Sequence, residues 1–476
     1  MQVLFQSSSE SPSSRGLGII PCPIDRFDDT EKSVPHMGWN SSDLLNSQTD
    51  SLGMEELSYY YFVHSYCAKY MPEIYPDAVQ WAHTTTQYGQ ELFISSVRKD
   101  NIFGTQFHPE KSGTAGLNLL DAWLRKSQPD RPSTPPSSHT FRSPKPKHNL
   151  TKRIIACMDV RANDEGDLVV TKGDQYDVRE NSAPSSEQSA VTTGAVRNLG
   201  KPVSLAARYY SSGADELCLL NITSFRHSPL QDQPMLAVVR AAAKCVFVPL
   251  TIGGGIKETV DPDGTKRSAL EVAGAYFRAG ADKVSIGSEA VYAVENMRST
   301  GKGDGTSAIE RIAHVYGRQA VVVSIDPRRV YVDPEIYNGP YKDEVVRGRA
   351  DAVDSERVKA WWYQCTVSGG RESRPVSVVQ LARGAETLGA GEILLNSIDR
   401  DGTGLGFDLE LVGLVRRSVK IPVVASSGAG KKEDFVEVFE RGGVEAALAA
   451  GIFHREEVGI GEVKGALRAA GINVRN

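Results

Sequence analysis

The second half of the chain repeats its own pattern, and each copy ends an apolar run on an aspartate. The first copy reads Arg-Ile-Ile-Ala-Cys-Met-Asp over 153–159, and the second reads Gln-Ala-Val-Val-Val-Ser-Ile-Asp over 319–326. Asp159 and Asp326 are therefore 167 residues apart. An internal repeat constrains the fold strongly, because the copies must form equivalent parts of one structure. We predict two duplicated half-barrels, each of which contributes one carboxylate to a shared site.

Eight short apolar runs follow residue 150, separated by segments long enough for helices. The runs are nearly continuous, which is typical of parallel strands covered on both faces. Eight such units predict a (β/α)8 barrel of the α/β class, with halves at 153–318 and 319–476. The predicted strands are 154–158, 216–221, 246–251, 283–286, 320–325, 392–396, 423–426 and 446–449. The predicted helices include 205–211, 269–279, 378–388 and 409–418.

Two polar stretches depart from a minimal barrel. Residues 163–198 follow the first predicted strand, and residues 331–371 follow the fifth. Both lie after the carboxyl end of a strand, where the active-site loops of such barrels belong. We predict irregular loops for both.

A proline-rich segment precedes the barrel. Residues 127–150 contain six prolines among Ser, Thr, Lys and Arg, a composition that predicts an extended linker. We therefore divide the chain into a first domain at 1–126, a linker at 127–150 and the barrel at 151–476.

The composition indicates an ordinary soluble globular protein. A net charge of −5 gives no electrostatic reason to expect nucleic acid or an anionic membrane as partner. No run of 18 apolar residues and no signal peptide is found, so we expect no membrane span and a cytoplasmic protein. The six cysteines form no Cys-x-x-Cys pair, and we expect neither a disulfide scaffold, nor a metal site, nor a cofactor.

The paired aspartates suggest acid–base chemistry. Strand ends at the carboxyl face supply the catalytic groups of such barrels, and Asp159 and Asp326 can serve as general acid and base. Either one alone could instead cap a helix or anchor a loop, but the repeat relation favours function. Asp399 and Asp401 follow the sixth strand and are further candidates, although their Asp-Gly sequence is also common in turns.

Glycine-rich loops follow strands three and seven, and small residues follow strands four and eight. Backbone N–H groups of such loops can approach a phosphate closely, although glycine also serves tight packing. Two such cradles in equivalent places predict a ligand with a phosphate at each end. The candidate binding residues are Gly254, Gly255, Ser288, Asp401, Gly402, Gly428, Ala450 and Gly451.

Four charged residues stand at the opposite, amino-terminal ends of the strands. They are Arg153, Glu216, Lys283 and Glu392. Charges at strand ends are usually solvated. Two cations and two carboxylates at matched depth could instead form a ring of salt bridges that closes the barrel floor.

These motifs resemble the imidazole glycerol phosphate synthases, in the fused form of fungi and plants. The resemblance implies a lyase of histidine biosynthesis whose barrel is the cyclase. Such a barrel takes a ribulosyl-formimino aminoimidazole carboxamide bisphosphate and ammonia, and yields imidazole glycerol phosphate and aminoimidazole carboxamide ribotide. The resemblance further implies that Asp159 and Asp326 are the acid–base pair, that Lys172 lies on a mobile loop that closes over substrate, and that the four strand-start charges gate ammonia. It also implies a chain that works as a monomer.

The segment before the linker resembles a class I glutamine amidotransferase. His108-Pro-Glu110 matches the base and its orienting carboxylate. His64, Ser65 and Tyr66 match the glutamine-contacting strand, and Gln2 matches the end of the nucleophile motif.

The family's nucleophilic cysteine would fall before Met1, and the remaining Cys22 and Cys67 do not stand in a strand-to-helix turn. We expect a truncated amidotransferase domain with an unpaired sheet edge, no glutamine hydrolysis, and a barrel that uses free ammonia.

Two other interpretations remain open. The isomerase of the preceding histidine step shares the duplicated half-barrel, both phosphate cradles and a pair of strand-end aspartates. A non-catalytic protein that binds a bisphosphate is the alternative from another class, although both aspartates and Lys172 are present.

Overall fold

The computed structural model describes residues 1–45, 51–55, 58–125, 144–145, 148–162, 168–171, 202–222, 234–261, 263–349 and 356–476. Its internal contacts divide it into two compact units. Unit 1 comprises residues 1–153, 420–422 and 471–476, and unit 2 comprises 154–419 and 423–470. We describe each unit by itself.

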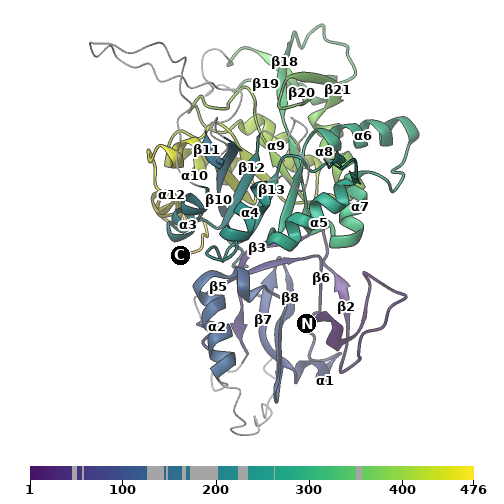
Figure 1. Ribbon diagram of the computed structural model, residues 1–476, viewed down its shortest axis with the longest axis vertical. Coiled ribbons are helices and arrows are strands. Elements are labelled where there is room, and N and C mark those ends of the chain that lie inside the picture. Colours follow the sequence, from purple (N-terminus) through teal and green to yellow (C-terminus); the bar gives the residue numbers. More distant parts are fainter. Residues whose placement is uncertain are drawn as a thin grey trace. The chain divides into compact units, whose positions relative to one another are not determined.

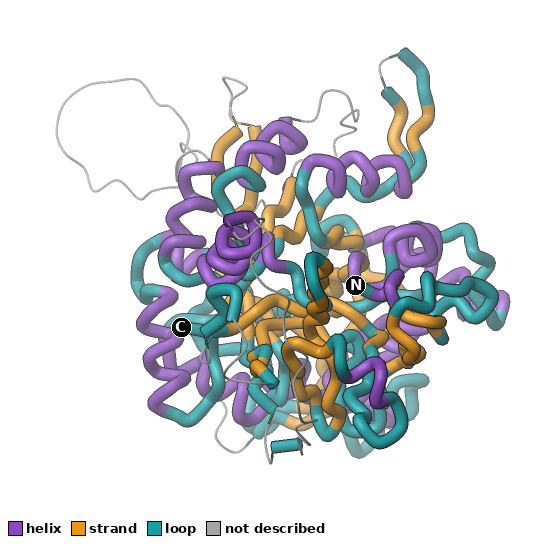
Figure 2. Tube along the Cα trace, turned by 90° about the horizontal axis from the view of Figure 1, so that it is seen from below, coloured by secondary structure: helices purple, strands orange, loops and turns teal. Residues whose placement is uncertain are grey.

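Unit 2 is a closed barrel of eight parallel strands. In ring order these are β10 (Arg153–Ala162), β12 (Glu216–Asn221), β13 (Leu250–Gly253), β16 (Lys283–Ile286), β17 (Val321–Ile325), β22 (Glu392–Leu395), β23 (Val423–Ser426) and β24 (Ala446–Ala449). The pairing of β24 with β10 closes the ring. Helices cover the outside of the strands (Figures 1 and 2). The predicted (β/α)8 fold is therefore confirmed.

Capping residues fix the ends of the barrel helices. Ser268 and Ser377 each form a capping box at the start of α5 (Ala269–Ala279) and α8 (Val378–Leu388). Gly280 and Gly389 end these helices with positive φ angles of 114° and 112°, a conformation that favours glycine. The other helices are α3 (Pro202–Ser211), α4 (Pro234–Ala242), α6 (Ser288–Thr300), α7 (Ala308–Tyr316), α9 (Leu409–Ser418), α10 (Lys432–Arg441), α11 (Gly451–His454) and α12 (Ile460–Ala469).

The prediction of an irregular loop at 331–371 was wrong. An antiparallel sheet follows β17, made of β18 (Pro327–Val332), β19 (Val346–Arg347), β20 (Ala360–Val367) and β21 (Glu372–Ser377). It stands at one end of the barrel in Figure 1. β20 contains Trp, Tyr, Cys, Thr and Val and is buried along nearly its whole length, so it lacks the alternation that marks a one-sided strand.

The structure differs from the prediction in smaller ways as well. The third barrel strand begins at Leu250 rather than at the predicted residue 246, because Pro249 just before it has no N–H to donate to a ladder. β11 (Leu168–Thr171) folds back on β10 as an antiparallel partner. A short hairpin joins β14 (Thr259–Val260) to β15 (Lys266–Arg267). The 3₁₀ turns η3 (Arg318–Ala320) and η4 (Lys342–Glu344) complete unit 2.

The described residues of unit 1 form three sheets. β1 (Phe5–Ser8), β2 (Ile20–Arg26) and β6 (Tyr66–Cys67) form the first, β3 (His36–Ser41) and β5 (Tyr59–His64) the second, and β4 (Asp43–Leu44), β7 (Ala82–Tyr88), β8 (Glu91–Lys99) and β9 (Ile102–Thr105) the third. Its helical segments are η1 (Gln2–Leu4), α1 (Pro76–Val79), η2 (Pro109–Lys111) and α2 (Gly113–Arg125). β1 lies at the edge of its sheet, and Val3 and Leu17 beside it are exposed.

No helix in the described part of the chain is both long and apolar enough to cross a membrane.

Candidate active site at the carboxyl end of the barrel

Asp159 and Asp326 lie on opposite sides of the barrel ring. Asp159 is in β10 and Asp326 directly follows β17, and three strands separate β10 from β17 in either direction. Asp159 pairs with Leu220, the residue before the last of β12, so it lies at the carboxyl end of the ring. Both side chains are partly exposed. The internal repeat therefore places one carboxylate on each side of the same rim.

The environment of Asp326 favours its protonated form. Burial raises the pKa of its carboxyl group, and a hydrogen bond from Asn396 opposes this shift. The amide Nδ2 of Asn396 donates to Oδ1 of Asp326 over 2.6 Å. The backbone carbonyl of Asp326 accepts from the N–H and the hydroxyl of Thr366 in β20, at 3.2 and 2.6 Å. The sheet after β17 thus fixes the backbone that carries this aspartate.

Asp159 lines a cavity of about 120 Å³ together with residues of the second half of the barrel. Five predicted binding residues line it with Asp159: Asp401, Gly402, Gly428, Ala450 and Gly451. Ser427 in the same wall has a φ of 74°, unusual for a residue with a Cβ. Strained backbone of this kind is concentrated at ligand sites. The structure therefore brings the second cradle and one aspartate together.

The first cradle lies on strands three and four. Gly254 and Gly255 follow β13 with φ angles of 86° and 76°, which glycine adopts without strain. Ser288 begins α6, directly after β16. Its hydroxyl accepts a hydrogen bond of 3.0 Å from the N–H of Ser368, in the turn between β20 and β21. These three predicted residues do not line the cavity of Asp159. Lys172 lies outside the described residues.

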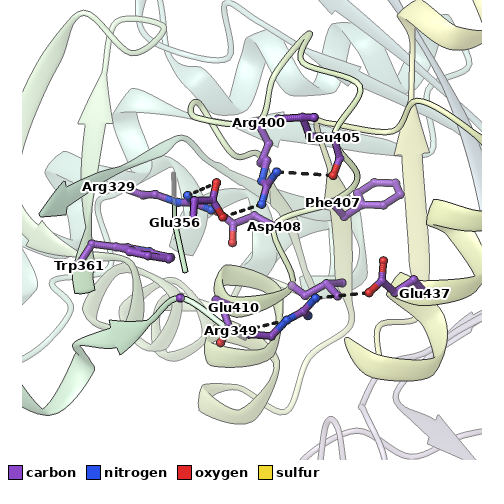
Figure 3. A pocket seen from close by; sticks show the side chains of 12 residues that line it. Arg329, Arg349, Glu356, Trp361, Arg400, Leu405, Phe407, Asp408, Glu410 and Glu437 are labelled. Carbon is purple, nitrogen blue, oxygen red and sulfur yellow. Dashed lines mark hydrogen bonds and ion pairs between the residues drawn. The ribbon is translucent and has the colours of Figure 1, made fainter. Parts of the chain in front are cut away.

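A buried network of charges supports the loop after β22 (Figure 3). Glu356 accepts from Arg329 at 2.6 Å and from Arg400 at 2.8 Å, and Arg329 also contacts Asp408 at 2.7 Å. The N–H of Arg329 donates to the carboxylate of Asp399 over 2.9 Å. These contacts anchor the loop that carries Asp401.

The same network borders a second cavity of about 160 Å³. Arg349 stands there between Glu410 and Glu437, at 3.6 and 3.5 Å (Figure 3). Arg329, Glu356 and Asp408 are far apart along the chain, so no sequence motif predicts this cavity or the network.

Three of the four strand-start charges form a buried ion cluster. The ammonium group of Lys283 lies 2.6 Å from a carboxylate oxygen of Glu216 and 2.6 Å from one of Glu392. All three side chains are at most 2% exposed, so the solvated alternative is wrong for them. Arg153 begins β10 and is also fully buried. Their role as an ammonia gate stays a prediction.

His108 and Glu110, the catalytic residues expected in unit 1, lie side by side. Nδ1 of His108 lies 2.9 Å from a carboxylate oxygen of Glu110, and both side chains are about half exposed. The hydrogen bond to His108 lowers the pKa of Glu110. This geometry suits a histidine held by a carboxylate and facing solvent.

The predicted glutamine-binding residues lie close together, and their role stays a prediction. The Gln2 amide donates to the backbone carbonyl of Tyr66 over 3.4 Å. The Ser65 hydroxyl is buried and has no hydrogen-bond partner among the described residues. The His64 side chain is in the core instead, with its two ring nitrogens 3.2 Å from Nδ1 of His36 and 2.8 Å from the carbonyl of Tyr66. Both ring nitrogens of His64 therefore already have hydrogen-bond partners within unit 1.

Both cysteines of unit 1 are buried. Burial, with the nearby charge of Asp25, raises the pKa of Cys22 to about 11. Burial also raises the pKa of Cys67 well above its ordinary value. A thiol that stays protonated at neutral pH is unreactive. In the described part of the chain no three His, Cys, Asp or Glu side chains are grouped to hold a metal ion.

The fold and the site define a duplicated half-barrel protein with two opposed aspartates, attached to a domain of the amidotransferase type. Residues 153–459 match the family model described as "Histidine biosynthesis protein", and residues 1–126 match "Glutamine amidotransferase class-I". With its barrel and its amidotransferase-type domain in one polypeptide, the chain belongs to the imidazole glycerol phosphate synthase family in its fused form.

Two fused relatives are similar over the whole chain. "Imidazole glycerol phosphate synthase hisHF" of Emericella nidulans is 52% identical over 100% of this chain and 84% of its own length. The protein of the same description from Schizosaccharomyces pombe is 51% identical over 100% of this chain and 85% of its own. "Imidazole glycerol phosphate synthase subunit HisF" of Bifidobacterium adolescentis is 37% identical over 69% of this chain and all of its own length. The family prediction is therefore confirmed.

Proposed function

We propose that the barrel, acting within a single chain, converts the ribulosyl-formimino aminoimidazole carboxamide bisphosphate and ammonia into imidazole glycerol phosphate and aminoimidazole carboxamide ribotide. The observation that carries this proposal is the placement of Asp159 and Asp326 on opposite strands of one rim. The two glycine-rich cradles suit a ligand with two phosphates. The relatives of the same architecture carry the name of this synthase.

The two aspartates are assigned different roles. The pKa of Asp326 is raised by burial, so this carboxyl holds its proton more readily and serves as the general acid. Asp159 opens into the cavity at the second cradle and serves as the general base. An acid and a base on opposite sides of a substrate can protonate one atom while deprotonating another.

The polypeptide of 476 residues is further proposed to take ammonia from solution rather than from glutamine. His108 and Glu110 are paired, but both cysteines of unit 1 are buried and have raised pKa values. Covalent amide hydrolysis of this type needs a thiolate beside the base, so two buried, protonated thiols in unit 1 support the use of free ammonia by this polypeptide.

The test compares nitrogen donors with the purified chain. Product formation from the bisphosphate substrate is measured with ammonium at alkaline pH and with glutamine at neutral pH. We expect turnover with ammonium and none with glutamine above the background without donor. Turnover with glutamine would refute the ammonia-only proposal, and absence of product with either donor would refute the synthase proposal. Conversion of the isomerase substrate would favour the enzyme of the preceding step instead.

A further inference from the structure

We propose that Arg455 binds the substrate phosphate at the second cradle, and that Glu457 is a positioning residue that orients it. This inference rests on the proposed function, because it assigns a residue to the same substrate. Arg455 directly follows the four-residue helix α11 and lines the cavity that contains Asp159. No sequence motif marks Arg455, because the charged residues that follow it, Glu456 and Glu457, are typical of an ordinary protein surface.

The guanidinium group of Arg455 lies against the cradle itself. A Cβ atom added to Gly451 would stand 2.7 Å from Nη1 of Arg455 and 3.5 Å from its Cζ. Real Cβ atoms essentially never approach another heavy atom so closely. The guanidinium, at the end of a flexible side chain, therefore lies against Gly451 at the wall of the phosphate cradle.

Glu457 fixes the orientation of this guanidinium. Its two carboxylate oxygens lie 2.6 Å from Nε and 2.9 Å from Nη2 of Arg455. This pairing uses one edge of the planar group. Nη1, which faces Gly451, makes no hydrogen bond to any described residue. The remaining donors are thus available to a ligand in the cradle.

The charge balance of the cavity also requires a cation. Asp159 and Asp401 line it and repel a phosphate. His454 lines it as well, but burial, followed by the charges of Arg208 and Arg455, lowers the pKa of His454 to about 4. That imidazole is neutral at physiological pH. Among the described residues that line this cavity, Arg455 is the only lysine or arginine, so it supplies the positive charge that a phosphate needs there.

A simpler interpretation is that Arg455 and Glu457 form an ordinary surface ion pair. Their side chains are 36% and 47% exposed, and exposed pairs contribute little to stability. The neighbouring pair of Arg208 and Glu456 provides a control, with a distance of 2.7 Å, side chains 50% and 72% exposed, and no place in the cavity wall. The two interpretations differ in their effect on substrate binding.

The experiment measures ammonium-dependent kinetics of the full chain and of Arg455→Gln, Arg455→Lys, Glu457→Gln and Arg208→Gln. A charge-assisted phosphate contact predicts a KM for the bisphosphate about 10- to 100-fold higher in Arg455→Gln, with a much smaller change in kcat. Arg455→Lys should recover only part of this loss, because one ammonium group cannot serve Glu457 and a phosphate in the geometry of a guanidinium. Glu457→Gln should raise KM less than Arg455→Gln, and Arg208→Gln should change neither constant.

A second measurement separates this inference from the synthase proposal. Inorganic phosphate should raise the melting temperature of the wild type and of Arg208→Gln, and should raise that of Arg455→Gln less. An unchanged KM, or equal stabilisation of wild type and Arg455→Gln by phosphate, would overturn the role of Arg455 while leaving the proposed reaction intact. If the wild type shows no turnover, the phosphate experiment still decides the role of Arg455.

Discussion

At the scale of single residues, gene duplication has given the barrel two aspartates in unequal surroundings. Asp326 accepts a short hydrogen bond from Asn396 and has its pKa raised by burial. Asp159 instead faces a cavity that also contains Asp401. Pairs of carboxyl groups whose environments differ in this way are suited to separate acid and base roles. The internal repeat in the sequence identifies the two aspartates as a pair. Their different surroundings could not be predicted, because they come from residues that are distant in sequence.

Replacement of either aspartate by asparagine should abolish acid–base catalysis without unfolding the barrel. We expect kcat with ammonium to fall about 10²- to 10⁴-fold in Asp159→Asn and in Asp326→Asn. Because burial raises the pKa of Asp326, its contribution to stability is present at low pH and is lost as pH rises through that pKa. Asp326→Asn should therefore be at least as stable as wild type at alkaline pH, and its advantage should shrink in acid.

Steady-state kinetics and thermal unfolding at two pH values test this expectation. Asp333→Asn is the control, since Asp333 is exposed in the connection after β18 and should leave kcat unchanged. Full activity in Asp326→Asn would contradict its role as general acid. A lower melting temperature of that variant at alkaline pH would show that the carboxylate stabilises the fold.

At the scale of secondary structure, the barrel strands could be predicted from the sequence but the sheet after β17 could not. Residues 216–221, 283–286, 423–426 and 446–449 were predicted as strands and have those limits in the structure. Their short apolar runs between turns carry the signal. In 331–371 long polar connections separate the strands, so the pattern of short apolar runs between turns is absent there. The ion pairs of Arg329 depend on which loops meet in space, and no local pattern predicts them.

The network around Glu356 should hold the loop of Asp401 in place. Glu356 contacts Arg329 and Arg400, and its side chain is only 12% exposed. Glu356→Gln should lower the free energy of unfolding by about 1–3 kcal/mol, because two buried guanidinium groups lose a charged acceptor. It should also raise the KM for the bisphosphate several-fold, since Asp401 lines the cavity at the second cradle.

Urea unfolding and ammonium-dependent kinetics provide both readouts. Glu335→Gln is the matched control, because Glu335 pairs with Arg347 at 2.9 Å while 78% exposed, and such pairs contribute about 0–1 kcal/mol. If the two variants behave alike, the buried network has no special role in positioning the loop.

At the scale of the whole molecule, buried ionisable groups are accommodated in two ways. In unit 2 several buried cations pair with carboxylates, such as Lys283 with Glu216 and Lys464 with Asp215. In unit 1 buried histidines pack among aromatic rings, with ring contacts to Phe27, Phe62 and Tyr88 around His36. Burial lowers the pKa of His36, and it lowers the pKa values of His64 and His83 to about 4 each. These imidazoles are neutral in the folded unit.

Unit 1 should therefore lose stability in mild acid. A histidine whose pKa is lowered by folding binds its proton preferentially in the unfolded state, so its stabilising effect is present above pH about 6.5 and is lost progressively toward about 4. Each such histidine changes the free energy of unfolding by about 1.4 kcal/mol per pH unit in this range.

Calorimetry over this range, with limited proteolysis to assign each transition, should show the transition of unit 1 moving to lower temperature as the pH falls. His83→Gln should reduce that slope, whereas His314→Gln, at an exposed position of α7, should not. A pH-independent transition of unit 1 would mean that the histidines protonate within the folded core, and that water reaches a cluster which the structure shows as closed.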